Sequence, residues 1–142
     1  MQNLHNTVFK SLCHLVGRWK DADPTKNVLV DYRMSAHNSI LVETWAWPDK
    51  NIEALTIYHM DDEILMATHY CPIGNQPKLL FVPTDDDRLT FKLASITNLP
   101  DKNTGHNVEF WMQLDSANQF TRQEIYLENE EPDVMLLSLI HI

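Results

Sequence analysis

The segment from Thr68 to Pro77, THYCPIGNQP, concentrates side chains that could do chemistry. An imidazole can act as a general base or bind a metal ion, and a nearby thiol can act as a nucleophile. His69 and Cys71, however, are two positions apart in an expected strand, so their side chains stand roughly 6–7 Å apart. That separation is too long for direct proton transfer. We therefore favour a semi-buried structural thiol at Cys71 over a catalytic one.

Two further histidines could join His69 to make a site. His59 comes just before an acidic turn, and His106 ends the longest irregular segment, residues 96–106. Three converging imidazoles could bind zinc or another divalent metal ion, one could bind haem iron, or one could act as a general base. No His-x-x-x-His or Cys-x-x-Cys spacing supports a metal site. The alternative, which we favour, is that these histidines bind loop carbonyls at the rim of a barrel.

Whether His59 and His69 share a face depends on the length of the turn between their strands. A two-residue turn at 61–62 pairs Ala54 with His69 and puts His69 on the face of Tyr58, with His59 on the other face. A turn one residue longer brings His59 onto the face of His69. The sequence leaves both registers open.

The turn after Cys71 contains two amide side chains. We expect Asn75, which follows Gly74, to adopt a left-handed conformation and cap backbone groups. Gln76 precedes a proline and is therefore extended. It either builds the loop or points its amide into the barrel mouth as a ligand contact.

Glu43 is a carboxylate in the otherwise apolar segment ILVETWAW. If it points inward it needs a partner, and Arg33 on the neighbouring strand is the expected one. An outward surface pair of the same two residues is the alternative. The aromatic residues of these strands are expected to form core or to line a cavity. The candidate ligand-binding residues are Arg33, Glu43, Tyr58, His59, His69, Asn75, Gln76 and His106.

Hydrophobic spacing predicts the elements that position these residues. A helix is expected over residues 3–16, capped by Asn3 or Asn6 and ended by Gly17. One apolar face is expected along it, formed by Leu4, Val8, Leu12, Leu15 and Val16. Beyond the helix, alternation of period two predicts about ten strands. They cover residues 18–22, 27–36, 40–47, 52–60, 64–71, 78–84, 88–95, 107–114, 119–128 and 134–142.

Many strands at regular spacing, with one leading helix and no βαβ alternation, indicate an all-β fold. Several strands carry apolar residues on both faces, which favours a closed antiparallel up-and-down barrel over an open sandwich. At 142 residues the chain is expected to form a single domain, 1–142.

Composition excludes several classes of partner. Lysine and arginine number 11 against 20 acidic residues, a formal charge of −9, so we expect neither nucleic acid nor an anionic membrane surface as a partner. Two cysteines do not make a disulfide framework and suggest free thiols in a reducing compartment. The first 20 residues lack an uninterrupted apolar region of a signal peptide. A cytoplasmic protein is expected.

The motif LVGRWKD, a Gly-x-Trp after a short helix, resembles that of lipocalins and related calycin barrels. The resemblance implies that Trp19 plugs one end of the barrel and that Arg122 covers it. The central segment with THYCPIGNQP resembles an uncharacterised group of bacterial lipocalin-like proteins. It implies a ligand-binding barrel of about ten strands, akin to fatty-acid-binding proteins and nitrobindins, without a settled activity. That group often has two histidines flanking one residue before the eighth strand, whereas this chain has only His106.

The leading expectation is therefore a barrel that binds a small, largely apolar molecule inside its cavity. His59, His69, His106 and Gln76 would orient the molecule. The alternatives are a barrel isomerase or hydrolase, or a haem- or metal-binding protein, using His69 or His106. An interaction module is favoured only if side chains fill the barrel. A homodimer is one expectation for the assembly.

Overall fold

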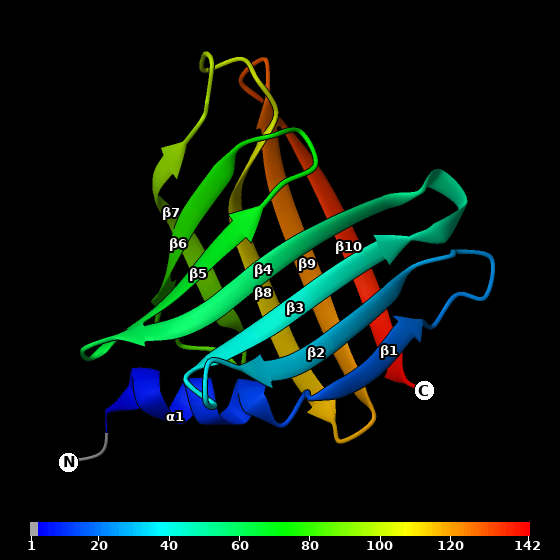
Figure 1. Cartoon of the computed structure of the whole chain (residues 1–142), viewed down its shortest axis with the longest axis vertical. Coiled ribbons are helices and arrows are strands. Elements are labelled where there is room, and N and C mark those ends of the chain that lie inside the picture. Colours follow the sequence, from blue (N-terminus) through cyan, green and yellow to red (C-terminus); the bar gives the residue numbers. More distant parts are fainter. Residues whose placement is uncertain (1–2) are drawn as a thin grey trace.

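Ten antiparallel strands close into a barrel in the computed structural model, which describes residues 3–142 (Figure 1). Each strand pairs with its neighbours in the chain, and β1 pairs with β10 to close the ring. This confirms the predicted up-and-down all-β barrel. The elements are α1 (Leu4–Cys13), β1 (Gly17–Asp21), β2 (Leu29–Ser35), β3 (Ile40–Trp47), the short 3-10 turn η1 (Pro48–Lys50), β4 (Ile52–Asp61), β5 (Ile64–Tyr70), β6 (Gln76–Val82), β7 (Leu89–Thr97), β8 (His106–Ser116), β9 (Gln119–Glu128) and β10 (Glu131–His141).

Alternation of apolar residues located the strands well and their ends less well. Strands β3 and β9 have the predicted bounds, whereas β6 begins at Gln76 rather than at residue 78, and β10 at Glu131 rather than at residue 134. Both early starts lie in polar sequence, where pairing with the neighbouring strand extends the strand beyond its apolar part. In residues 3–142 no helix is long and apolar enough to cross a membrane.

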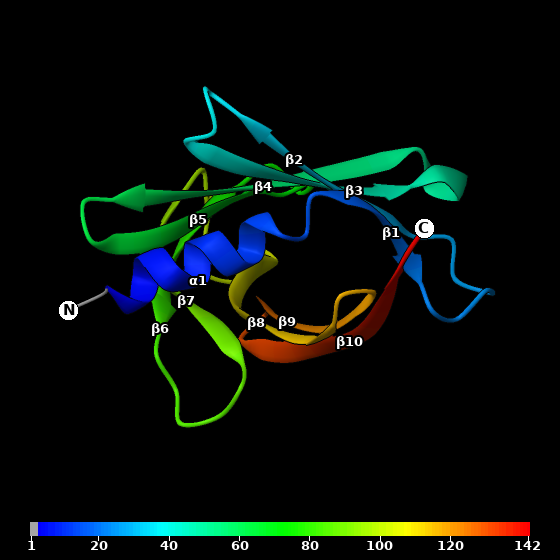
Figure 2. The ribbon, with the colours of Figure 1, turned by 90° about the horizontal axis from the view of Figure 1, so that it is seen from below.

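The helix α1 lies across the lower end of the barrel (Figures 1 and 2). Asn3 caps it, with its Oδ1 accepting a hydrogen bond from the backbone N–H of Asn6 at 3.1 Å. The buried side chains of α1 are Val8, Phe9 and Leu12.

The predicted apolar face is too long at both of its ends. Leu4 and Val16 are exposed, and the helix stops at Cys13. Gly17 does not end the helix but opens β1 with a φ of +138°. The helix is tied to the barrel by His5, whose Nδ1 accepts the backbone N–H of Leu65 at 3.0 Å.

Trp19 plugs this lower end, as the resemblance to calycin barrels implies. Its indole Nε1 donates to the carbonyl of Leu15 at 2.8 Å, and its ring meets the rings of Phe120 and His141 edge to face, each at 4.9 Å between centroids. The expected cover by Arg122 is wrong, because that side chain lies against Phe110 and binds carboxylates in the middle of the barrel.

Side chains fill the lower and middle parts of the barrel. Most of the largest fully buried ones are apolar or aromatic: Leu12, Trp19, Tyr32, Leu41, Tyr58, Leu65, Leu79, Phe91, Phe110, Met112 and Phe120. The rings of Phe91 and Phe110 stack at 4.7 Å between centroids. These side chains therefore form a packed apolar core in the lower and middle parts of the barrel.

Replacement of Gly17 by alanine is expected to destabilise the fold by roughly 1–3 kcal/mol. A Cβ atom there would lie 2.8 Å from Nε2 of His141, which packs on Trp19, and the residue would keep a positive φ. Gly74→Ala is the matched control, because Gly74 has a φ of +108° but nothing within 4 Å of the added Cβ. Urea unfolding should show the larger loss for Gly17→Ala. Equal losses would contradict a role for the His141 contact.

Candidate functional site

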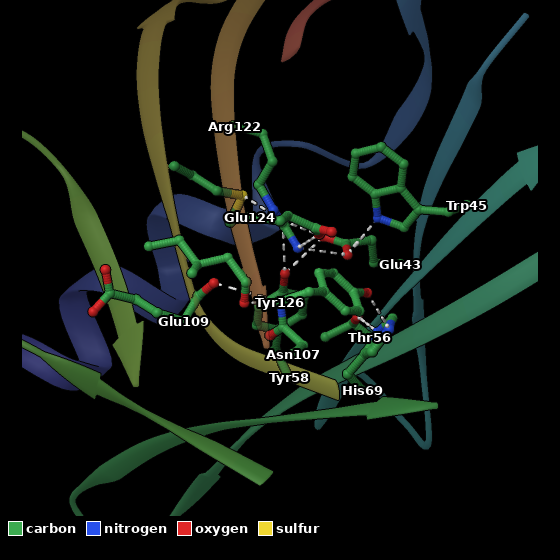
Figure 3. Close-up of polar contacts among 12 residues, drawn as sticks. Glu43, Trp45, Thr56, Tyr58, His69, Asn107, Glu109, Arg122, Glu124 and Tyr126 are labelled. Carbon is green, nitrogen blue, oxygen red and sulfur yellow. Dashed lines mark hydrogen bonds and ion pairs between the residues drawn. The ribbon is translucent and has the colours of Figure 1, made fainter. Parts of the chain in front are cut away.

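A buried carboxylate, Glu43 on β3, is the centre of the polar interior (Figure 3). It is 0% exposed and accepts hydrogen bonds from the hydroxyls of Tyr32 and Tyr58 at 2.7 and 2.6 Å and from Nε1 of Trp45 at 2.6 Å. Arg122 on β9 donates to both of its oxygens, at 3.0 and 3.3 Å. We call these five residues the Glu43 network; they join β2, β3 and β4 to β9 across the barrel.

The electrostatics of the Glu43 network fix its protonation. Burial by itself would raise the pKa of Glu43, but the Arg122 guanidinium and the three neutral donors together hold it below its ordinary value. Burial and the neighbouring Glu43 raise the pKa values of Tyr32 and Tyr58 well above the usual range. Both phenols therefore remain hydrogen-bond donors to an ionised carboxylate.

Arg33 is not the partner of Glu43, and that prediction is wrong. Tyr32 pairs with Glu43 and Arg33 with Val42, so Arg33 lies on the outer face, where it is exposed. The partner is Arg122, which the sequence analysis named only as the expected cover of Trp19. A signal for it exists in QFTRQEIYLE, where Arg122 stands two positions after a large apolar residue, Phe120, on the face that points inward.

A second polar cluster lies nearer the C-terminal end of β9, around His69 of β5 (Figure 3). Nδ1 of His69 is 3.0 Å from the hydroxyl of Thr56, and Nε2 is 3.2 Å from the hydroxyl of Tyr126. Burial lowers the pKa of His69 and raises the pKa of Cys71. The cluster therefore holds a neutral imidazole and a protonated thiol, which makes Cys71 a poor nucleophile.

His59 does not meet His69. Thr56, not Ala54, pairs with His69, because the strands continue to Asp61 and Ile64 and the turn lies one residue later than predicted. The shift moves the pairs by two positions and so leaves the faces unchanged, with His69 on the face of Thr56. His59 lies on the other face, and its Nδ1 is 3.0 Å from the carbonyl of Met60.

His106 does not meet His69 either. It pairs with Leu127, whereas Asn107 pairs with Tyr126, so Asn107 is the residue on the face of the His69 cluster. The Nδ1 of His106 is 2.7 Å from the carbonyl of Thr104 in the preceding loop. The three histidines therefore lie at three separate places.

Asn75 and Gln76 both hold the loops at the upper end together. The amide nitrogen of Asn75 donates to the carbonyl of Gly105 at 2.9 Å. Gln76 Oε1 accepts from Thr97 and Asn98 at 2.7 and 3.0 Å. The positive φ of this turn belongs to Gly74 and not to Asn75, which corrects the expected left-handed asparagine.

The three histidines do not converge on one metal site, and haem binding by a single histidine remains a prediction. In residues 3–142 no group of three or more histidine, cysteine, aspartate or glutamate side chains is arranged to hold a metal ion. Both ring nitrogens of His69 face a hydroxyl partner, Thr56 or Tyr126. A metal ion at His69 would therefore have to displace one of these hydrogen bonds.

A pocket of about 430 Å³ opens at the upper part of the barrel, between β10, η1 and the β1–β2 loop. It lies where β1 is short: only Trp19–Asp21 pair with Leu139–His141, so the rest of β10 pairs with β9 on one side and has no strand beside it on the other. We call it the mouth pocket. Its lining residues are Lys26, Asn27, Val28, Trp47, Asp49, Lys50, Met135, Leu136 and Leu137.

The chain matches no model of a known protein family and no curated protein sequence. The arrangement of its own side chains is therefore the basis for a functional conclusion. It combines a rigid polar interior, a neutral histidine with both nitrogens engaged, and an apolar opening beside them.

Replacing Arg122 by methionine is expected to destabilise the protein by about 3–5 kcal/mol, because Glu43 would be left as an unpaired buried charge. Lys102→Met is the control, since Lys102 pairs with Glu130 on the exposed surface and such pairs contribute at most about 1 kcal/mol. The measurement is urea unfolding at pH 7. Similar costs for both variants would show that the buried pair contributes no more than a surface pair.

Stability is expected to fall as the pH drops below 6.5, the ordinary pKa of histidine, because burial holds the pKa of His69 below that value. At a pH between 6.5 and the lower pKa of His69 in the folded protein, the unfolded chain binds a proton at His69 that the folded protein does not. Protons therefore favour unfolding in this range. In His69→Gln this part of the pH dependence should disappear. His37→Gln, at an exposed turn, controls for the loss of one histidine. An unchanged slope in His69→Gln would contradict the assignment.

Proposed function

We propose that this protein binds a small, largely apolar molecule in the mouth pocket. The observation that carries the proposal is the exposure of side chains on the inner face of β10. Leu139, at the plugged end, is 0% exposed, whereas Met135, on the same face, is 41% exposed. A large apolar side chain that points into a barrel and still meets water marks a space that the protein itself does not fill.

The chemistry of the pocket wall supports an apolar ligand. Val28, Trp47, Met135 and Leu137 supply a wall of aliphatic and aromatic surface. The volume lies within the range of roughly 300–1,000 Å³ typical of small-molecule sites. Covering such surface with an apolar ligand contributes about 25 cal/mol per Å² of area removed from water. The ring of Trp47 stacks beside that of Trp45, with 6.1 Å between centroids, so the aromatic wall is held in place.

The proposed site differs from the expected one. Binding was expected around His59, His69, His106 and Gln76, but none of these lines the mouth pocket. A barrel that binds an apolar ligand agrees with the resemblance to lipocalin-like proteins, which remains a prediction. The cytoplasmic location, the homodimer and the alternative of a barrel enzyme also remain predictions.

The test is binding of a neutral apolar fluorescent probe, N-phenyl-1-naphthylamine, to the purified chain. Trp47→Ala should weaken binding roughly tenfold or more, since loss of the burial of a large apolar side chain costs about 1.5–3 kcal/mol. Tyr70→Ala removes an exposed aromatic ring that does not line the mouth pocket and should leave the affinity unchanged.

Two results would overturn the proposal: the unmodified protein does not bind the probe, or Trp47→Ala and Tyr70→Ala lose the same affinity. Native mass spectrometry of the purified protein provides an independent check. A co-purified small molecule should be present in the unmodified protein and depleted in Trp47→Ala.

A further inference from the structure

The polar groups inside the barrel do not balance in charge. Arg122 is bound by two carboxylates, Glu43 at 3.0 Å and Glu124 at 3.0 Å. The pKa of His69 lies below its ordinary value, so this ring adds no positive charge at neutral pH. The buried ion pairs thus carry two formal negative charges and one positive charge. An uncompensated carboxylate in a poorly solvated place is unfavourable unless a cation or a donor reaches it.

Arg122 has no free, accessible N–H group that could bind an anionic ligand. Its two terminal nitrogens bind Glu43 and Glu124. Its remaining nitrogen, Nε, has no partner but also no accessible surface, and the guanidinium lies 4.0 Å over the ring of Phe110. The cation inside this barrel is therefore already neutralised by two carboxylates.

The unused polar atoms near the upper end are acceptors. Glu124 uses Oε1 for Arg122, whereas its Oε2 has no hydrogen bond among the described residues, and its side chain remains 11% exposed. Oδ1 of Asn107 is buried without a partner. The register places Glu124 opposite Phe110 and Asn107 opposite Tyr126, so both acceptors lie on the inner face of neighbouring strands (Figure 3).

Glu124 does not line the mouth pocket but lies beside residues that do. Glu124 pairs across the strands with Met135, and Arg122 pairs with Leu137; Met135 and Leu137 both line the pocket. Residues directly opposite each other in an antiparallel pair have Cβ atoms about 4.5–5.5 Å apart. A ligand lying on Met135 is therefore within reach of the free oxygen of Glu124.

We propose that the ligand of the mouth pocket is an amine, with its protonated nitrogen at Glu124 and its apolar body on Trp47 and Met135; this rests on the proposed function. The ammonium group supplies the missing positive charge and donates hydrogen bonds to Glu124 Oε2 and, on a ligand that reaches farther, to Asn107 Oδ1. The faces of the neighbouring Trp45 and Trp47 also attract a cation.

Three ligands of equal chain length test the proposal: decylamine, 1-decanol and decanoate, each competing with N-phenyl-1-naphthylamine at pH 7. We expect decylamine to bind at least roughly tenfold more tightly than decanoate, with decanol between them. Glu124→Gln retains an acceptor for Arg122 and should remove the preference for the amine while leaving the affinity for decanol unchanged. Asp49→Asn removes a carboxylate from the rim of the same pocket and should preserve the preference.

The rim of the mouth pocket carries two exposed lysines, Lys26 and Lys50, which would favour an anion if they held the ligand. Tighter binding of decanoate than of decylamine would therefore overturn the proposal, as would a preference lost in Asp49→Asn but retained in Glu124→Gln. If the neutral probe binds but decylamine, 1-decanol and decanoate compete equally, the amine proposal fails and the binding function stands. If neither the probe nor any of the three ten-carbon ligands binds, the binding function itself fails.

Discussion

The ion pair between Glu43 and Arg122 is the interaction on which the interior depends. A carboxylate that is 0% exposed is tolerated only with a fixed counter-ion and with every lone pair occupied. Tyr32, Tyr58 and Trp45 meet the second condition. Because these donors come from separate strands on one wall and the guanidinium from the opposite wall, the pair fixes how the two walls of the barrel lie.

This ordered middle divides the barrel into two regions. Below it, α1 and the Trp19 plug close the end, and aromatic side chains fill the space. Above it, β1 is too short to cover β10, and the wall opens into the mouth pocket. The polar network lies behind the wall of this pocket, because Arg122 pairs with Leu137 and Trp45 stacks beside Trp47. It also sets the charge that the ligand would meet.

Much of the fold could be predicted because strand alternation is a local property of the sequence. The site could be predicted only in part, because orientation across a barrel depends on pairs far apart in the chain. An inward Glu43 in need of a partner was one of two alternatives that the sequence left open. Its partner is 79 positions away, and no local pattern connects the two. Arg33 is near in sequence, but the β2–β3 register turns it outward.

The histidines show the same limit to predicting the site from the sequence. Their chemical versatility draws attention to them, yet a shift of one position decides whether a strand residue points inward. The register between Asn107 and Glu109 is interrupted by an irregularity. Such a bulge changes which residues of β8 face the interior and cannot be recognised in the sequence. Asn107, an inconspicuous residue, therefore faces the interior in place of His106.

The short β1 also affects how the protein behaves in concentrated solution. Backbone groups alternate in direction along a strand, and the carbonyl of Ser138 points toward β1, so the N–H and C=O groups of Leu136 and Val134 point to the same open side. An open edge with exposed apolar residues is a template on which a strand of another molecule can add. Pro132, which has no N–H to donate, and the charge of Asp133 limit this edge to a few residues. The open side of β10 beside the mouth pocket thus also requires protection against aggregation.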